Sequence, residues 1–145
     1  MEKFKLKIVT PEKVVLTDEV NQLSVSTTSG QITILAHHLP LISQLAPGEI
    51  IVKHQNKEES LMAVFGGFIE VLTEEVIILA DRAEYAADID EKRAEEAKQR
   101  AEEALKEQHL DSEQFAMLSA TLEKELNRLK VARKYKQTGN RIIKN

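Results

Sequence analysis

Few side chains of this sequence stand in a pattern that catalyses reactions or holds metal ions. His37 and His38 are adjacent, and on a strand they would face opposite sides. His54 and His109 have no partner at ligand spacing, so we expect all four histidines to be polar surface or loop residues. The chain has no cysteine, which excludes thiol chemistry and cysteine-based zinc sites, and no phosphate-binding glycine motif is present. We therefore expect no catalytic residue, no metal site and no enzyme activity.

Four cationic side chains could form a binding site for an anion. Arg93 and Arg100 are seven residues apart, so on a helix they lie nearly in line, about 10 Å apart along the axis. Lys124 and Arg128 are one turn apart on a second predicted helix and could converge on the first pair, where four cations could hold a polyphosphate. The alternative is local pairing, because Glu96 precedes Arg100 by four residues, a spacing typical of solvated ion pairs.

The second half of the chain predicts two helices. Neither Gly nor Pro occurs between residues 68 and 138, which permits long helices. Asp88 with Glu91 has the spacing of a capping box, and Asp90 is another candidate N-cap. Asp111 with Gln114 has the spacing of a second capping box. A short connection between the helices indicates an antiparallel hairpin, either a mobile element with docked and extended states or a static coiled coil. The predicted helices are residues 90–108 and 112–135.

The first half predicts many short strands. Phe4, Leu6 and Ile8 alternate with lysines, the pattern of a half-buried strand. Further apolar runs follow at intervals of about 8–12 residues, separated by turn signals, which is typical of a β-sandwich or barrel. Gly66 and Gly67 favour a bulge or a tight strand exchange between two of these strands. The predicted strands are residues 4–8, 20–27, 32–35, 50–52, 61–65, 68–72 and 76–80.

The predicted fold class is therefore β + α. An N-terminal β-sandwich or flattened barrel, residues 1–86, is followed by a C-terminal antiparallel two-helix hairpin, residues 87–145. The net charge of −4 conceals a basic end, because residues 124–145 carry eight basic and one acidic side chain. Mild overall acidity argues against nucleic-acid binding. No apolar run approaches the roughly 20 residues of a membrane span, and we expect no secretory leader.

Two segments carry a resemblance to a known family. They are residues 29–41 (SGQITILAHHLPL), followed by Leu45 and Pro47-Gly48, and residues 65–71 (FGGFIEV), followed by residues 78–84 (ILADRAE). With the alanine-rich hairpin after residue 88, they resemble the epsilon subunit of the bacterial F-type ATP synthase over the whole chain.

The resemblance implies a function in a large complex. The sandwich would dock on the gamma subunit and on the ring of c subunits, in the central stalk that couples proton-driven rotation to ATP synthesis. The hairpin would lie on the sandwich or extend into the catalytic alpha/beta hexamer, where it inhibits ATP hydrolysis. The chain would then lie peripherally on the cytoplasmic face of the bacterial cell membrane, attached only through the complex. The basic segment expected to contact acidic loops of the beta subunits comprises Lys124, Arg128, Lys130, Arg133, Lys134 and Lys136.

The resemblance also implies a regulatory ligand. Residues 89–94 (IDEKRA) match the I/L-D-x-x-R-A pattern associated with ATP binding in some members of the family, where ATP holds the hairpin folded. No other cofactor is implied. Lys124 stands where better-known ATP binders carry Arg and supplies charge without a planar fork. The implied ATP-binding residues are Glu84, Ile89, Asp90, Arg93, Ala94, Arg100, Lys124 and Arg128.

A different class of function is compatible with the same elements. A stand-alone β-sandwich binding module could use its hairpin as a coiled coil for oligomerisation. A stable dimer through the helices would favour this module, and a monomer would favour the rotor subunit.

Overall fold

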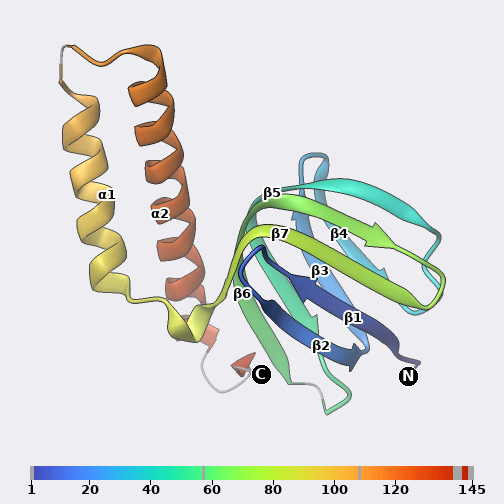
Figure 1. Cartoon of the computed structure of the whole chain (residues 1–145). Coiled ribbons are helices and arrows are strands. Elements are labelled where there is room, and N and C mark those ends of the chain that lie inside the picture. The colour runs from blue at the N-terminus through green and yellow to red at the C-terminus, as the bar shows by residue number, and fades with distance from the viewer. Residues whose placement is uncertain (1, 57, 108, 139–141, 144–145) are drawn as a thin grey trace.

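The computed structural model describes the chain except residues 1, 57, 108, 139–141 and 144–145, and confirms the predicted fold class. A strand-rich N-terminal part is followed by two long antiparallel helices that stand beside it (Figure 1). The strands are β1 (Phe4–Val9), β2 (Val14–Val20), β3 (Gln22–Thr27), β4 (Gly30–Leu35), β5 (Leu41–Lys53), β6 (Glu59–Val71), β7 (Glu75–Tyr85) and β8 (Ile142–Ile143). The helices are the 3-10 turn η1 (Ala86–Asp88), α1 (Glu91–Leu105) and α2 (Ser112–Thr138).

One hydrogen-bonded sheet forms the sandwich. Its strand order is β2-β1-β7-β6-β5-β3-β4, with β8 added to β6 outside this path. Neighbours in this order are antiparallel except β1 and β7, which are parallel. The long strands β5, β6 and β7 curve, so that β1 and β2 lie across from β3 and β4 (Figure 1).

The core lies between these layers. The alternation predicted for the first strand is confirmed, because Phe4, Leu6 and Ile8 are all buried. They share one apolar cluster with Leu23 of β3 and Ile34 of β4. Since the whole cluster falls between residues 4 and 85, the sandwich contains its own complete core.

The predicted break at Gly66 and Gly67 is wrong. β6 runs through both residues, and its register with β7 does not shift, since Phe65 faces Arg82 and Gly67 faces Ala80. Gly67 has φ +114°, and a Cβ there would lie 2.1 Å from the Leu79 carbonyl oxygen. The glycine therefore permits a close backbone approach within one continuous strand.

β2, the first part of β5 and the short C-terminal β8 were not predicted. β2 has no separate counterpart among the predicted strands, and β5 begins at Leu41 rather than at residue 50. Pro47 lies inside β5, at the place where the register between β3 and β5 shifts. A proline is tolerated there because the irregular pairing does not require its missing N–H group.

The helix starts were predicted correctly. The Asp90 side chain accepts a hydrogen bond from the Arg93 amide at 3.1 Å and caps α1. The other candidate, Asp88, lies in η1, so the predicted capping box with Glu91 is wrong. The Asp111 carboxylate accepts from the Gln114 amide at 2.8 Å, and the Gln114 side chain accepts from the Asp111 amide at 3.1 Å. This is the expected reciprocal capping box. α1 ends at Leu105, and its predicted last residue, 108, lies outside the described residues.

The C-terminal half of α2 holds the hairpin on the sandwich. The Asn127 amide nitrogen donates to the Gly48 carbonyl at 2.9 Å and to the Val64 carbonyl at 3.1 Å. Lys134 pairs with Glu49 at 2.6 Å. A second apolar cluster, which we call the docking cluster, comprises Leu61, Ala63, Ala86, Ile89, Val131 and Ala132, with Ile51 and Tyr135 packed against it.

Within the described residues, no helix has the length and apolar character needed to cross a bilayer.

Candidate functional site

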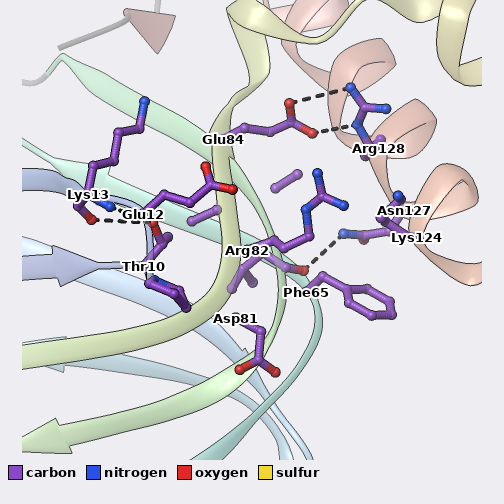
Figure 2. Close-up of a pocket in the computed structure, with 14 residues that line it drawn as sticks. Thr10, Glu12, Lys13, Phe65, Asp81, Arg82, Glu84, Lys124, Asn127 and Arg128 are labelled. Carbon is purple, nitrogen blue, oxygen red and sulfur yellow. Dashed lines mark hydrogen bonds and ion pairs between the residues drawn. The ribbon is translucent and has the colours of Figure 1, made fainter. Parts of the chain in front are cut away.

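A pocket of about 270 Å³ lies where α2 meets the sandwich. Its walls come from the β1–β2 connection, from the middle of β6, from the end of β7 and from α2. Figure 2 shows polar side chains from these elements converging on it. The volume is slightly below the usual range of small-molecule sites, roughly 300–1,000 Å³.

Arg128 links α2 to the end of β7 at this pocket. Its guanidinium donates to both carboxylate oxygens of Glu84, through Nε to Oε1 and through Nη2 to Oε2 at 3.4 Å (Figure 2). Its Nη1 donates to Glu125 Oε2 at 2.8 Å. Burial opposes the guanidinium charge, but the hydrogen bond to Glu84 and the negative charges of Glu84 and Glu125 outweigh it and raise the pKa of Arg128. The group therefore stays charged and works as a two-sided clamp.

Glu125 is a nearly buried carboxylate in the same network. Its side chain is 4% exposed, and Lys124 Nζ lies 3.5 Å from its Oε1 atom. A buried carboxylate is costly unless it is paired, and here Lys124 and Arg128 provide the opposite charges. Separating α2 from the sandwich breaks the contact of this network with Glu84, which comes from β7.

The pocket is mixed in charge. Lys13, Arg82 and Lys124 line it together with Glu12 and Asp81 (Figure 2). Because cations on both the sandwich and α2 reach its lining, an anionic ligand would find opposite charges on both elements. Such a ligand would have to share Arg128 with its carboxylate partners.

The structure brings together part of the implied ATP site. Glu84, Lys124 and Arg128 line the pocket. Ile89 and Ala94 are buried, Ile89 in the docking cluster.

Asp90 caps α1, as described above. Ile89, Asp90 and Ala94 thus have structural roles in the folded hairpin and do not line the pocket.

Arg93 and Arg100 do not line the pocket either. The Arg93 side chain is 84% exposed, with its Nε 4.0 Å from Asp90 Oδ2. Arg100 is exposed and forms no ion pair in the part of the chain that the structure describes. The expected Glu96–Arg100 pair is thus not formed among the described residues, and that local alternative is wrong for Arg100.

The predicted basic segment is largely paired in the docked hairpin. Arg133 contacts Glu91 at 3.2 Å and Glu95 at 3.3 Å, both on α1. Lys136 also pairs with Glu91, and its hydrogen bond, together with that of Arg133, lowers the pKa of this carboxyl.

Of the six predicted basic residues, Lys130 forms no ion pair with any described residue. The last two basic residues of the basic end, at positions 141 and 144, lie outside the described residues.

One cluster was not anticipated from the sequence. His54 Nε2 lies 3.0 Å from Ser60 Oγ, and His54 Nδ1 lies 3.3 Å from Asp18 Oδ2. This is the order of groups in a hydrolytic triad, but Ser60 is fully buried in β6 and no substrate can reach its hydroxyl. His54 does lie in the expected loop, although its side chain is only 11% exposed. Asp18 and His54 are 36 residues apart in the sequence, so no local spacing pattern could have indicated that they are in contact.

Within the described ranges, no group of three or more acidic or histidine side chains could hold a metal ion.

Family models cover most of the chain. The model of the ATP synthase delta/epsilon chain β-sandwich domain matches residues 3–86, and that of the delta/epsilon long α-helix domain matches residues 87–133. The chain is 46% identical over 132 residues to the ATP synthase epsilon chain of Chloroflexus aggregans, covering 90% of this chain and 93% of that one. It is 42% identical over 134 residues to that of Dehalococcoides mccartyi, covering 92% and 95%.

Solved structures show the same fold. A chain of the Euglena gracilis mitochondrial ATP synthase, in a structure of its OSCP, F1 and c-ring, superposes with a TM-score of 0.78 at 25% identity, covering 90% of this chain and 81% of that one. A chain of the Tetrahymena thermophila mitochondrial ATP synthase central stalk and c-ring gives 0.58 at 17% identity, covering 90% and 97%, a likeness of fold alone. With both domains matched in order and close relatives aligned along nearly their full length, this chain belongs to the ATP synthase epsilon chain family.

Proposed function

We propose that this chain is a non-catalytic rotor subunit in the central stalk of a proton-translocating ATP synthase. It couples rotation to ATP synthesis through its sandwich and restrains ATP hydrolysis through its hairpin. Family membership and the likeness to a chain in a structure of F1 with its c-ring support this placement. The complex would carry the chain peripherally on the cytoplasmic face of the bacterial membrane.

An exposed apolar face on the sandwich supports docking to the gamma subunit, next to the c ring. Phe68 of β6 and Leu79 of β7 are directly opposite each other in the sheet, and both are more than half exposed. Ile42 of β5 lies two residues along on the same face and is 72% exposed. A sheet face of this kind is typical of a surface that another subunit covers.

Substitution of this face tests the docking. Phe68→Ser and Leu79→Ser should each weaken capture of the chain by purified gamma subunit. Val14→Ser is the matched control, since Val14 is 54% exposed but lies on β2. Equal capture of all three variants would refute docking through this face.

One observation carries the proposal for the hairpin: in its folded and docked form, the charges of α2 are paired and part of its apolar surface is uncovered. In the docked state Arg133, Lys134 and Lys136 are paired with carboxylates of other elements. Two large apolar side chains of α2, Phe115 and Leu126, are 56% and 47% exposed. An α2 released from both α1 and the sandwich would offer free cations and an apolar face to the catalytic alpha/beta hexamer, where acidic loops would attract it.

A truncation separates the two roles. Residues 1–88 contain the whole sandwich core, so this piece should fold and bind gamma. The full chain should suppress ATP hydrolysis by the parent complex, whereas residues 1–88 should bind without suppressing it. Equal inhibition by both would refute the hairpin mechanism.

ATP is proposed as a regulatory ligand of the docked state. Lys124 and Arg128 in the pocket would contact its phosphates, and the exposed Arg93 and Arg100 would have to be recruited from α1. ATP can shift the hairpin only through a difference in affinity between the docked and extended states. Since the pocket joins α2 to the sandwich, ATP bound there would favour docking.

Calorimetric titration of the isolated chain with ATP tests this part. Arg93→Ala should abolish the binding heat, because this residue makes only an exposed contact with Asp90 and its loss should not unfold the chain. Lys92→Ala, an exposed cation beside it, is the control and should bind as the parent does. No heat from the parent chain at millimolar ATP would refute a nucleotide site.

A further inference from the structure

The start of β6 has a free edge. β7 pairs with β6 only from the Met62–Tyr85 position onward, because the chain turns into η1 directly after Tyr85. Residues 59–61 are therefore paired with β5 on one side and are not covered by β7 on the other. An edge of this kind presents unpaired backbone groups that accept a further strand.

The C-terminal strand β8 occupies this edge. Ile142 pairs with Glu59, and Ile143 pairs with Ser60, in parallel orientation. β8 follows closely after α2, which ends at Thr138. The tail thus returns from the helix to the same sheet on which the helix is docked.

Side-chain contacts hold the free edge of β6, residues 59–61, in place. The hydroxyl of Ser60 is held by His54, whose other ring nitrogen faces Asp18. The next residue, Leu61, belongs to the docking cluster together with Val131 of α2. Strand pairing and helix docking therefore meet within three consecutive residues of β6.

The end of α2 cannot move far while β8 stays paired. Four steps of chain from Thr138 to Ile142 span at most about 14 Å, so Thr138 stays within that distance of the edge of β6. α2 has 27 residues and is about 40 Å long, so moving the whole helix away from the sandwich by its own length exceeds this tether.

We propose that β8 is a latch: by adding a strand to the free edge of β6, it holds the end of α2 on the sandwich and must release before the hairpin can extend. The helical family model ends at residue 133, so the latch lies in a tail beyond the matched domain. Its consequence for inhibition rests on the function proposed above. The latch itself is a property of the isolated chain.

Thiol labelling measures the opening, because the native chain has no cysteine. Ala132→Cys places a small thiol in the docking cluster, at a position 3% exposed, where a maleimide reacts only after the hairpin undocks. Val25→Cys, fully buried in the sandwich core, reports global unfolding. Both are made in the full chain.

Two changes remove the latch, and one keeps it. Deletion of residues 139–145 and the double substitution Ile142→Pro with Ile143→Pro should each speed labelling of Ala132→Cys roughly 5–30-fold, the effect of losing a few backbone hydrogen bonds. The proline variant keeps the tail charges but cannot add a strand. Ile142→Val with Ile143→Val is the control and should label at the parent rate. Labelling of Val25→Cys should not change in any variant.

Two results would overturn the latch. One is an unchanged Ala132→Cys rate in both the deletion and the proline variant. The other is a parent rate that falls as protein concentration rises, which would assign the paired strand to a second copy of the chain. A complex that shows no inhibition would refute the proposed function while leaving the labelling result intact.

Discussion

Asn127 should control how firmly the hairpin docks. Its amide nitrogen donates to carbonyls of β5 and β6, so Asn127→Ala removes two hydrogen bonds between α2 and the sandwich. At about 1 kcal/mol net for each, the docked state loses about 2 kcal/mol. The higher helix propensity of alanine acts on docked and undocked α2 alike and largely cancels. The ratio of docked to undocked chains should fall roughly thirty-fold.

The Ala132→Cys labelling rate measures this ratio directly. Asn127→Asp should label at least as fast as Asn127→Ala, because a carboxylate there would face the carbonyl oxygens of Gly48 and Val64. Gln137→Ala, an exposed change near the end of the same helix, is the control. Equal labelling of Asn127→Ala and the parent would show that the two hydrogen bonds do not hold the hairpin.

Three further outcomes are expected. The pKa of Glu91 is lowered in the folded chain, so its ion pairs stabilise the fold above the ordinary carboxyl pKa near 4.5, and this stabilisation is lost as pH falls through the lowered pKa. Glu91→Gln should therefore flatten the loss of thermal stability between about pH 5 and pH 3, and an unchanged slope would contradict this. Burial, together with the negative charges of Asp18 and Asp88, raises the pKa of Tyr85. In a Tyr135→Phe chain, where Tyr85 is the one tyrosine left, the absorbance titration should have its midpoint above pH 10, and the stability that the neutral phenol gives the fold should be lost as pH rises from 10 through this midpoint. Gly67→Ala should lower the urea midpoint by more than Gly30→Ala, since both have φ +114° but only Gly67 would meet a backbone oxygen; equal losses would show that the close approach relaxes freely.

Features set by local chemistry were predictable from the sequence. The capping box at Asp111 involves residues three positions apart, so its spacing alone predicts the start of α2. For α1 the sequence offered both Asp88 and Asp90, and the structure uses Asp90. The alternation in β1 likewise predicts which face is buried. The fold class followed from these elements because their order leaves few ways to bury the apolar faces.

Features set by distant partners were not predictable in this way. The continuity of β6 through Gly66 and Gly67 depends on β7, which holds the register on both sides of the pair. The first part of β5 contains Pro47 and reads as a loop until its pairing with β6 is known.

The same holds for charge. Arg100 was expected to pair locally but does not among the described residues, whereas Arg128 pairs with Glu84, 44 positions away in sequence. That Arg128 and Glu84 belong to one site followed from family resemblance, because spacing along a single chain cannot give it.

The parallel pairing of β1 with β7 has a consequence for the order in which the chain is built on the ribosome. β7 is the only described strand that connects the β1–β2 pair to the rest of the sheet, and it is the last strand to be synthesised before the helices. Until residues 75–79 have left the exit tunnel, the first 20 residues have no sheet to join, and their apolar side chains have no neighbouring strand. The hairpin is translated only afterwards, so every strand of the sheet except β8 has been synthesised before α2 can dock.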